Sequence, residues 1–328
     1  TSRPLVVVTA PGPGSGKMAT CLSQLYHENK RGIKAGYAKF ETFPIWNIPL
    51  NHPVNLAYEA ATADLDDVNM IDPFHLDAYG VTTVNYNRDI EVFPVLNAMF
   101  EEIAGKSPYK SPTDMGVNMA GKCIFDDNVV RHEANQEIIR RYYQAECEYR
   151  KGNAGTGPIR KIELLMKKAG ISIADRPVVY ASNIKAEQTG APAAAMAMPD
   201  GKILTGKTSP LLGASSALLL NALKELAGIP DDVDLIPADF IEPIMKMKSE
   251  CQGDDSSLLH LNEILTALAV TGVNHSNAEE ALQHVPELKG LEAHSSVILS
   301  QVDEMVFKKL GINITCEPHY QSQKLYHK

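Results

Sequence analysis

The sequence is poor in the features that mark disulfide-rich, nucleic-acid-binding and membrane-spanning proteins. Its five cysteines are scattered over 328 residues without a Cys-x-x-Cys pair, which argues against a disulfide framework or a structural zinc site and favours reduced thiols in a cytoplasmic protein. There is no long basic block and the net charge is −9, so we expect no nucleic-acid partner. The apolar run at residues 218–220 is far too short to cross a bilayer, so we expect no membrane partner.

The start of the chain lacks the basic and apolar regions of a signal peptide. It also lacks an initial Met, and its first apolar run begins at residue 5, so we expect that an upstream part of a longer protein is missing. The composition, 44% apolar and 22% charged, is that of a soluble globular protein, and the length is sufficient for two domains.

A glycine-rich loop with a lysine follows the first apolar run. Residues 5–8 read LVVV, which predicts a strand buried on both faces, and the next turn reads GPGSGK. Apolar residues then recur at helical spacing, so the order is strand, glycine loop and helix, as in a P-loop. Such a loop closes backbone N–H groups around phosphate oxygens, and its lysine adds a positive charge. The candidate phosphate-binding residues are Gly12, Gly14, Ser15, Gly16 and Lys17.

The loop departs from the P-loop pattern at two positions. Pro11 stands where the pattern has Gly, and Met18 stands where it has the Ser or Thr whose hydroxyl ligates Mg²⁺. Thr20 or Ser15 could supply a hydroxyl instead. We expect phosphate or nucleotide binding here, with ATP and Mg²⁺ as cofactors, and the alternative is a structural glycine turn.

A second strand is predicted at residues 35–43, before Pro44. It follows the first strand after one helix, which predicts a parallel βαβ unit. Its run GYAKFET resembles a strand of the dethiobiotin-synthetase-like P-loop enzymes and, more distantly, of formate–tetrahydrofolate ligase. The resemblance implies that Lys39 faces nucleotide and substrate. Glu41 follows at the strand end where open α/β sheets bind ligands, and the alternative for Lys39 is a solvated lysine.

Three longer motifs resemble one bacterial family over essentially the whole chain. They read TAPGPGSGKMAT at residues 9–20, YAKFETFPIWN at residues 37–47 and TGKTSPLLGAS at residues 205–215. This is a conserved-hypothetical family, catalogued as a domain of unknown function, whose members extend further at the N-terminus. The resemblance implies a fold and a length but no reaction.

Two polar stretches in the first half are further candidates. Asp72 and His75 lie close together in a region rich in Pro and Asn, where they fit either a metal pair or an ordinary turn with a hydrogen-bonded His. Residues 110–121 are small and polar and contain Asp114. That carboxylate could hold Mg²⁺, as could the hydroxyl of Thr20, or it could only favour the dipole of a short helix.

The second half contains a formal P-loop match in the wrong context. We expect a strand at residues 177–181 and a hairpin at residues 193–205. Residues 201–208 fit the P-loop sequence pattern, but part of this segment is predicted as the second strand of the hairpin. We therefore interpret the match as false. The turn after it could still hold an anion at the N-terminus of the next helix. The residues concerned are Lys207, Thr208 and Ser209.

The order of these elements is similar to the cytidine-deaminase topology, although the zinc signature H-x-E with P-C-x-x-C is absent. The remaining elements are mostly helices, with a capping box at Ser276 and a closing strand at residues 312–316. The predicted helices span residues 87–104, 127–149, 159–169, 257–270 and 294–310. We interpret the histidines at 260, 275, 284 and 294 as surface or capping residues, because no metal-binding spacing links them.

Together these features predict an α/β protein in several parts. They are a P-loop-type domain with a parallel sheet (1–125), a helical connector (126–170), a smaller α/β domain with cytidine-deaminase-like topology (171–238) and a helical C-terminal region (239–328). The predicted function is an ATP-dependent, ligase- or kinase-like enzyme for a small metabolite, with Lys17, Lys39 and Glu41 in catalytic positions. The alternative is a non-catalytic phosphometabolite-binding or regulatory protein, and we expect a homo-oligomer.

Overall fold

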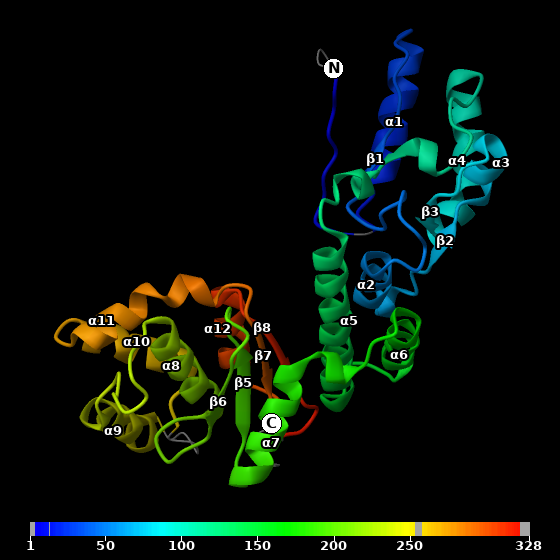
Figure 1. Cartoon of the computed structure of the whole chain (residues 1–328). Coiled ribbons are helices and arrows are strands. Elements are labelled where there is room, and N and C mark those ends of the chain that lie inside the picture. Colours follow the sequence, from blue (N-terminus) through cyan, green and yellow to red (C-terminus); the bar gives the residue numbers. More distant parts are fainter. Residues whose placement is uncertain (1–3, 13, 253–257, 322–328) are drawn as a thin grey trace. The chain divides into compact units, whose positions relative to one another are not determined.

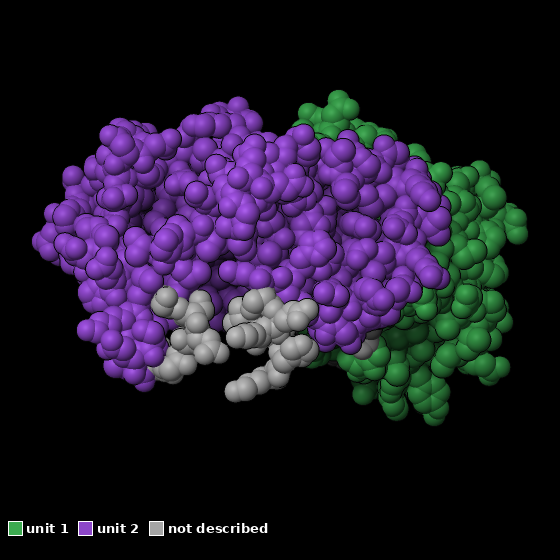
Figure 2. All heavy atoms as spheres, turned by 90° about the horizontal axis from the view of Figure 1, so that it is seen from below, with its two compact units in different colours: residues 1–135 green, residues 136–328 purple. Residues whose placement is uncertain are grey.

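The computed structural model describes residues 4–12, 14–252 and 258–321. The chain divides into two compact units, residues 1–135 (unit 1) and residues 136–328 (unit 2) (Figure 2). Each unit is described by itself. The long helix α5 (Asp127–Arg150) begins in unit 1 and continues in unit 2, in agreement with the predicted helix at residues 127–149.

Unit 1 consists of helices around two very short sheets (Figure 1). Its other helices are α1 (Lys17–Lys30), α2 (Pro53–Ala61), α3 (Pro73–Tyr79) and α4 (Asn87–Ala104), and 3₁₀ turns lie at Ala63–Leu65, Thr113–Met115 and Ala120–Cys123. Strand β1 (Lys39–Phe40) pairs in parallel with β4 (Gly116–Val117). Strand β2 (Asn69–Ile71) pairs antiparallel with β3 (Val84–Tyr86). The bounds of α4 are those that its apolar periodicity predicts.

The strand predicted at residues 5–8 is not formed. These residues are paired with no strand of the described chain, and the side chains of Leu5 and Val7 are 76% and 73% exposed. The second predicted strand is reduced to Lys39–Phe40, and its partner is β4 instead of the first apolar run. The predicted βαβ unit is therefore wrong. Apolar, β-branched residues favour a strand, but a strand forms only where a partner edge is present.

One apolar core cluster of unit 1 lies between α1 and α4. Leu22 and Leu25 of α1 pack against apolar side chains of α4 and against Met115. The α4 members are Phe93, Leu96 and Phe100. The aromatic rings of Phe74, Tyr37 and Tyr109 extend this cluster, and Tyr109 also exchanges two hydrogen bonds with the backbone of Tyr37. These contacts hold the chain before β1 against both helices.

Unit 2 contains one four-stranded mixed sheet with the order β6-β5-β7-β8 (Figure 1). Its strands are β5 (Ala193–Ala197), β6 (Ile203–Lys207), β7 (Glu292–Ser295) and β8 (Asn313–Cys316). The β5–β6 and β5–β7 pairs are antiparallel, and the β7–β8 pair is parallel. The helices are α6 (Gly157–Ala169), α7 (Pro177–Thr189), α8 (Ala214–Leu226), α9 (Ala238–Met247), α10 (Leu261–Gly272), α11 (Ser276–Gln283) and α12 (Gln301–Leu310). Short helical turns lie at Ile173–Asp175, Lys248–Gln252 and Val285–Leu288.

The two faces of this sheet differ in character. Ala194 and Ala293 face the main apolar core, which α8, α10 and α12 supply with Leu, Ile and Phe side chains. Because side chains alternate along a strand, the neighbouring His294 points to the opposite face, where the ring of Tyr143 from α5 packs against it at 4.8 Å. This face carries polar groups in the buried interior of unit 2.

Several local predictions for unit 2 are confirmed. The β5–β6 hairpin forms around a turn with Gly201 at φ 86°, and the closing strand is β8. Ile203 and Leu204 lie in β6, so the formal P-loop match at residues 201–208 is a strand of the hairpin. An added Cβ at Gly206 would lie 2.3 Å from the backbone nitrogen of Leu218, so this glycine serves the close packing of α8.

Other predictions for unit 2 are wrong because the secondary structure of these segments depends on contacts with residues distant in the sequence. Residues 177–181 begin α7, in which Pro177 takes the first helical position that its ring favours. His294 lies in β7, and the predicted helix 294–310 begins only at Gln301, where Ser300 caps it. The predicted capping box at Ser276 does not form, since His275 is the N-cap of α11 and no side chain there accepts a capping hydrogen bond. In addition, residues 292–316 supply two strands to the sheet of β5 and β6, so the region 239–328 is not a separate helical part.

Candidate functional site

In the glycine loop of unit 1 (Gly12 and residues 14–17), the lysine is hydrogen bonded to the loop itself. Lys17 Nζ donates hydrogen bonds to the carbonyl oxygen of Gly12 at 2.7 Å and to Ser15 Oγ at 3.2 Å. Ser15 Oγ in turn donates to the Gly12 carbonyl at 2.6 Å. Gly14 and Gly16 have φ values of 71° and 84°, in the left-handed region that favours glycine. The shape of the loop therefore requires Gly14 and Gly16, and the ammonium group of Lys17 contacts the backbone of the loop.

Helix α1 begins directly after this loop without a cap. Its N-cap is Gly16, no side chain accepts a hydrogen bond from the first turn, and the first turn contains no acidic residue. A helix start of this kind leaves backbone N–H groups and the positive end of the helix dipole available to an anion.

Positions 18 and 20 of this helix matter for Mg²⁺ binding, and the side chains at both positions contact other groups of the protein. Met18, which replaces the hydroxyl residue of a P-loop, is half-buried and packs against the core cluster of unit 1. Thr20 Oγ1 donates to the carbonyl oxygen of Gly16 at 3.1 Å. Met18 thus anchors α1, and position 18 carries no oxygen that could ligate a metal.

Lys39 is the centre of a charged network in unit 1. Its Nζ lies 2.8 and 2.7 Å from the two carboxylate oxygens of Asp89, at the start of α4, and 2.6 Å from Glu41 Oε1. It also donates to the hydroxyl of Tyr86, at the end of β3. Lys39 is therefore not a solvated lysine, because two carboxylates and a phenol surround it.

Burial shifts the ionisation of these groups. Burial by itself would lower the pKa of Lys39, but the carboxylates of Asp89 and Glu41 raise it above the ordinary lysine value. Burial also raises the pKa of Glu41, and the adjacent Lys39 only partly offsets this effect. Glu41 Oε2 is buried and has no hydrogen-bond partner in the described chain. Burial likewise raises the pKa of Tyr86, so its hydroxyl stays neutral. Perturbed groups of this kind are concentrated at functional sites.

A second charged group adjoins this network. Arg88 Nη2 lies 2.6 and 2.8 Å from the carboxylate oxygens of the buried Asp67, and the guanidinium stands 5.8 Å from the ring of Tyr86. Tyr58, whose hydroxyl is 3.5 Å from Asp67, stacks on Phe43. Tyr86, Arg88 and Asp89 are not among the site residues predicted from the sequence. The available signal was the polar run at residues 86–89, placed between a short strand and a long helix.

The structure joins the two polar stretches of the first half. Asp72 Oδ2 accepts hydrogen bonds from the Thr113 hydroxyl at 2.6 Å and from the Thr113 N–H at 3.2 Å. His75 Nδ1 lies 2.8 Å from Ser111 Oγ. Asp72 and His75 are thus hydrogen bonded to residues distant in the chain, and Asp72 is also the N-cap of α3.

Asp114, the predicted Mg²⁺ ligand, is held by its neighbours. Its Oδ2 accepts hydrogen bonds from the Tyr79 hydroxyl at 2.9 Å and from the Lys110 N–H at 2.8 Å. Within residues 4–12, 14–252 and 258–321, no group of three or more His, Cys, Asp or Glu side chains is arranged to hold a metal ion.

Lys207, Thr208 and Ser209 lie in unit 2, at the end of β6. Thr208 N–H donates to the carbonyl oxygen of Pro192, and Ser209 Oγ accepts hydrogen bonds from the next turn. Helix α8 begins only at Ala214. The three residues therefore precede the helix N-terminus instead of forming it.

Comparison with known families accounts for both halves of the chain. Residues 1–170 match the model described as "Domain of unknown function DUF1846, N-terminal", and residues 174–326 match its C-terminal counterpart. The chain belongs to the DUF1846 family. The boundary between the two family models lies close to residue 171, where the predicted smaller α/β domain begins.

The DUF1846 chain has similar relatives in streptococci. It is 58% identical to the UPF0371 proteins of Streptococcus thermophilus (strain CNRZ 1066) and Streptococcus uberis, and 57% identical to that of Streptococcus pneumoniae (strain P1031). Each match covers 328 residues, which is all of this chain and 66% of the relative. The predicted membership of a bacterial family is thus confirmed. Among the helices that the structure describes, none has the length and apolar character needed to cross a membrane.

Proposed function

We propose that the glycine loop of this DUF1846 chain binds the phosphate groups of ATP or of another phosphorylated metabolite. The observation that carries the proposal is the contact of Lys17 Nζ with the Gly12 carbonyl at the uncapped start of α1. A bound phosphate would take the place of that carbonyl as the partner of the ammonium group. The N–H groups of the first helical turn would provide further hydrogen bonds.

The side chains at this loop fit a phosphate better than they fit a phosphate with its Mg²⁺. Lys17 and the uncapped helix supply positive charge, but Met18 is packed into the core and Thr20 is hydrogen bonded to Gly16. Asp114 is engaged by Tyr79 and by the Lys110 N–H. The loop thus offers no evident Mg²⁺ ligand set.

In the catalytic version of this proposal, the chain is an ATP-dependent, ligase- or kinase-like enzyme that acts on a small metabolite. The Lys39 network supports it, because a lysine with two carboxylates and a neutral tyrosine can orient a substrate and neutralise developing charge. In this form Lys39 would exchange one carboxylate partner for a phosphate oxygen. Glu41, whose pKa is raised by burial, would be the carboxylate that is released.

The second candidate is a binding or regulatory protein that holds a phosphometabolite without converting it. Met18 favours this candidate, because it removes the hydroxyl through which a P-loop enzyme binds Mg²⁺. The homo-oligomer expected from the sequence would accompany either candidate.

Calorimetric titration tests the proposal. ATP, GTP and inorganic phosphate are each titrated, with and without Mg²⁺, into the chain, into Lys17→Ala and into Lys106→Ala, an exposed lysine that serves as the matched control. We expect binding that is lost in Lys17→Ala and retained in Lys106→Ala. Mg²⁺-dependent turnover of ATP would select the enzyme, and binding of phosphate or a phosphometabolite without turnover would select the binding protein. If none of these ligands bound, or if Lys17→Ala bound them unchanged, the proposal would be wrong.

A further inference from the structure

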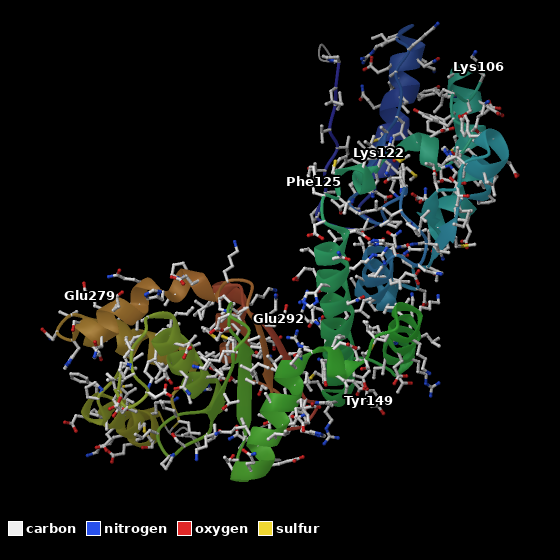
Figure 3. All side chains as sticks on the ribbon, in the orientation of Figure 1. Lys106, Lys122, Phe125, Tyr149, Glu279 and Glu292 are labelled. Carbon is white, nitrogen blue, oxygen red and sulfur yellow. The ribbon has the colours of Figure 1, made fainter. Side chains whose placement is uncertain are left out.

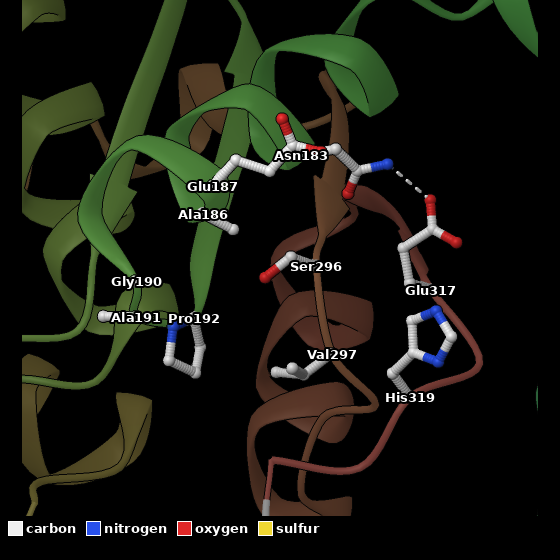
Figure 4. Close-up of a pocket in the computed structure, with 10 residues that line it drawn as sticks. All are labelled: Asn183, Ala186, Glu187, Gly190, Ala191, Pro192, Ser296, Val297, Glu317 and His319. Carbon is white, nitrogen blue, oxygen red and sulfur yellow. Dashed lines mark hydrogen bonds between the residues drawn. The ribbon is translucent and has the colours of Figure 1, made fainter.

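Unit 2 contains a pocket of about 460 Å³ at one end of its sheet (Figure 4). The end of α7 forms one wall, and the residues that follow β7 and β8 form the other. The polar lining residues are Asn183, Glu187, Ser296, Glu317 and His319. Ala186, Ala191, Pro192 and Val297 supply the apolar part of the lining. The volume lies in the range of pockets that hold small molecules.

The strand topology places this pocket where α/β sheets bind ligands. Strands β7 and β8 are parallel, so their carboxyl ends meet at one edge of the sheet. Ser296 directly follows β7, and Glu317 directly follows β8. Ligands of open sheets with parallel strands typically bind beyond these carboxyl ends, because the chain there is free to carry recognition groups.

The lining carries negative charge without a matching Lys or Arg. Glu187 and Glu317 both line the pocket, and neither a lysine nor an arginine is among the described lining residues. Asn183 Nδ2 donates to Glu317 Oε1 at 2.7 Å, as the dashed line in Figure 4 shows. Glu187 is one helical turn from Asn183 on α7, which places both on the same face of the helix.

A buried, hydrogen-bonded group of side chains lies next to Glu317. Arg176 Nε donates to Thr315 Oγ1 at 3.1 Å, and Thr315 Oγ1 lies 2.8 Å from His294 Nδ1. His294 is fully buried, and its Nε2 lies 3.3 Å from Glu317 Oε1 without the geometry of a regular hydrogen bond.

The charge of Glu317 is therefore not neutralised within the pocket wall. Burial lowers the pKa of His294, so the imidazole behind Glu317 is neutral. Burial by itself would raise the pKa of Glu317, but the adjacent His294 side chain and the hydrogen bond from Asn183 hold this pKa below its ordinary value. The nearest buried guanidinium, that of Arg176, is paired with Glu292, which is labelled on β7 in Figure 3. A carboxylate that stays ionised and receives only neutral donors attracts a cation.

We propose that this pocket binds a small molecule with a primary ammonium group on a short apolar chain. The ammonium group contacts Glu317 and Glu187, and Ser296 and His319 offer it further acceptors. The apolar chain packs against Pro192 and Val297. This site lies in unit 2 and is independent of the function proposed for unit 1.

Ligand-observed saturation-transfer NMR on the full chain tests this proposal. The probes are n-pentylamine, 1-pentanol and pentanoate, which share one chain and differ in charge. The titrations are made at about pH 8, above the ordinary titration range of imidazole. We expect pentylamine to bind and the alcohol and the carboxylate to bind at least about tenfold more weakly, as the loss of one charge-assisted contact would cause.

Three variants and one control locate the binding. Glu317→Gln is expected to weaken pentylamine binding about tenfold, and Glu187→Gln, at an exposed position, about threefold. Ala186→Leu fills the pocket and is expected to abolish binding. Glu279→Gln, an exposed carboxylate on α11 that is labelled in Figure 3, is expected to change nothing.

The proposal would be overturned by absence of pentylamine binding, by equal binding of the three probes, or by unchanged affinity in the lining variants. Circular dichroism checks that each variant is folded. If Glu317→Gln unfolds, Glu187→Gln and Ala186→Leu still decide the outcome, because one changes an exposed carboxylate and the other the volume of the pocket.

Discussion

Lys39 Nζ lies 2.8 and 2.7 Å from the two carboxylate oxygens of Asp89, although 50 positions separate these residues in the chain. This pair connects strand β1 with the first turn of α4. The resemblance to P-loop enzymes implies that Lys39 faces a nucleotide, but in the structure its ammonium group is paired with Asp89. The pair therefore bears on both the stability of unit 1 and the availability of Lys39.

Replacing Asp89 by Asn is expected to lower the free energy of unfolding of unit 1 by about 2 kcal/mol, the typical contribution of a hydrogen bond to a charged group. Lys39 keeps Glu41 as a partner, so the loss of stability is smaller than the loss expected when a buried charge is left without any partner. The fluorescence of Trp46, the single tryptophan, is a reporter for unit 1, because this side chain is buried there. Urea titration of Asp77→Asn, an exposed aspartate, is the control, and equal midpoints for the two variants would contradict the prediction.

Replacing Gly206 by Ala is expected to destabilise unit 2 by about 1–3 kcal/mol, the usual cost of overpacking. The new Cβ would lie 2.3 Å from the backbone nitrogen of Leu218 and 2.8 Å from the carbonyl oxygen of Ala214, and backbone atoms cannot move aside cheaply. Gly157→Ala is the matched control, since nothing lies within 4 Å of its added Cβ. Amide hydrogen exchange in β5 and β6 measures the effect. Unchanged protection in Gly206→Ala would mean that α8 does not approach β6 this closely.

Replacing Arg176 by Lys is expected to lower the free energy of unfolding of unit 2 by about 3–5 kcal/mol, the typical loss when a buried ion pair is broken. Arg176 donates to Thr315 Oγ1, to the carbonyl oxygens of Ala293 and Asn313 and to Glu292, and a lysine cannot reproduce this planar arrangement. The measurement is the hydrogen-exchange protection of β7 and β8. Arg160→Lys, at an exposed position on α6, should leave this protection intact, and a similar result for Arg176→Lys would refute the assignment.

The contribution of His294 to the stability of unit 2 is expected to fall as the pH drops below about 6.5, the ordinary value for histidine. Burial lowers the pKa of His294, so the unfolded chain takes up a proton that the folded chain excludes. The contribution of neutral His294 is therefore complete above about pH 6.5 and is lost as the pH falls. Glu317, with its lowered pKa, adds a loss of the same sign only below its own ordinary value of 4.5.

Protection factors of β7 and β8 between about pH 8 and 5 measure this dependence. The groups that face His294 are Glu317, Thr315, Tyr143 and the cation of Arg176, which opposes a second positive charge. His294→Gln cannot titrate and should flatten the pH profile. A profile with the same slope in this variant would show that another group controls the pH dependence.

The local features of the chain follow from the sequence. The bounds of α4 and nearly all of α5 follow from apolar periodicity, and the β5–β6 hairpin follows from the turn chemistry of Asp200 and Gly201. The rejection of the formal P-loop match at residues 201–208 needed only the strand context of Ile203 and Leu204. Such features depend on residues a few positions apart, which is why the sequence suffices for them.

The tertiary structure decided what depends on partners distant in the chain. Residues 5–8 have strand-forming side chains, but no strand of the described chain pairs with them. His294 is a buried strand residue because β5 and β8 pair with β7 on either side. Lys39 is engaged because Tyr86 and Asp89 reach it from β3 and α4. In each case burial and pairing with remote segments, which local propensity does not encode, determine the state of the residue.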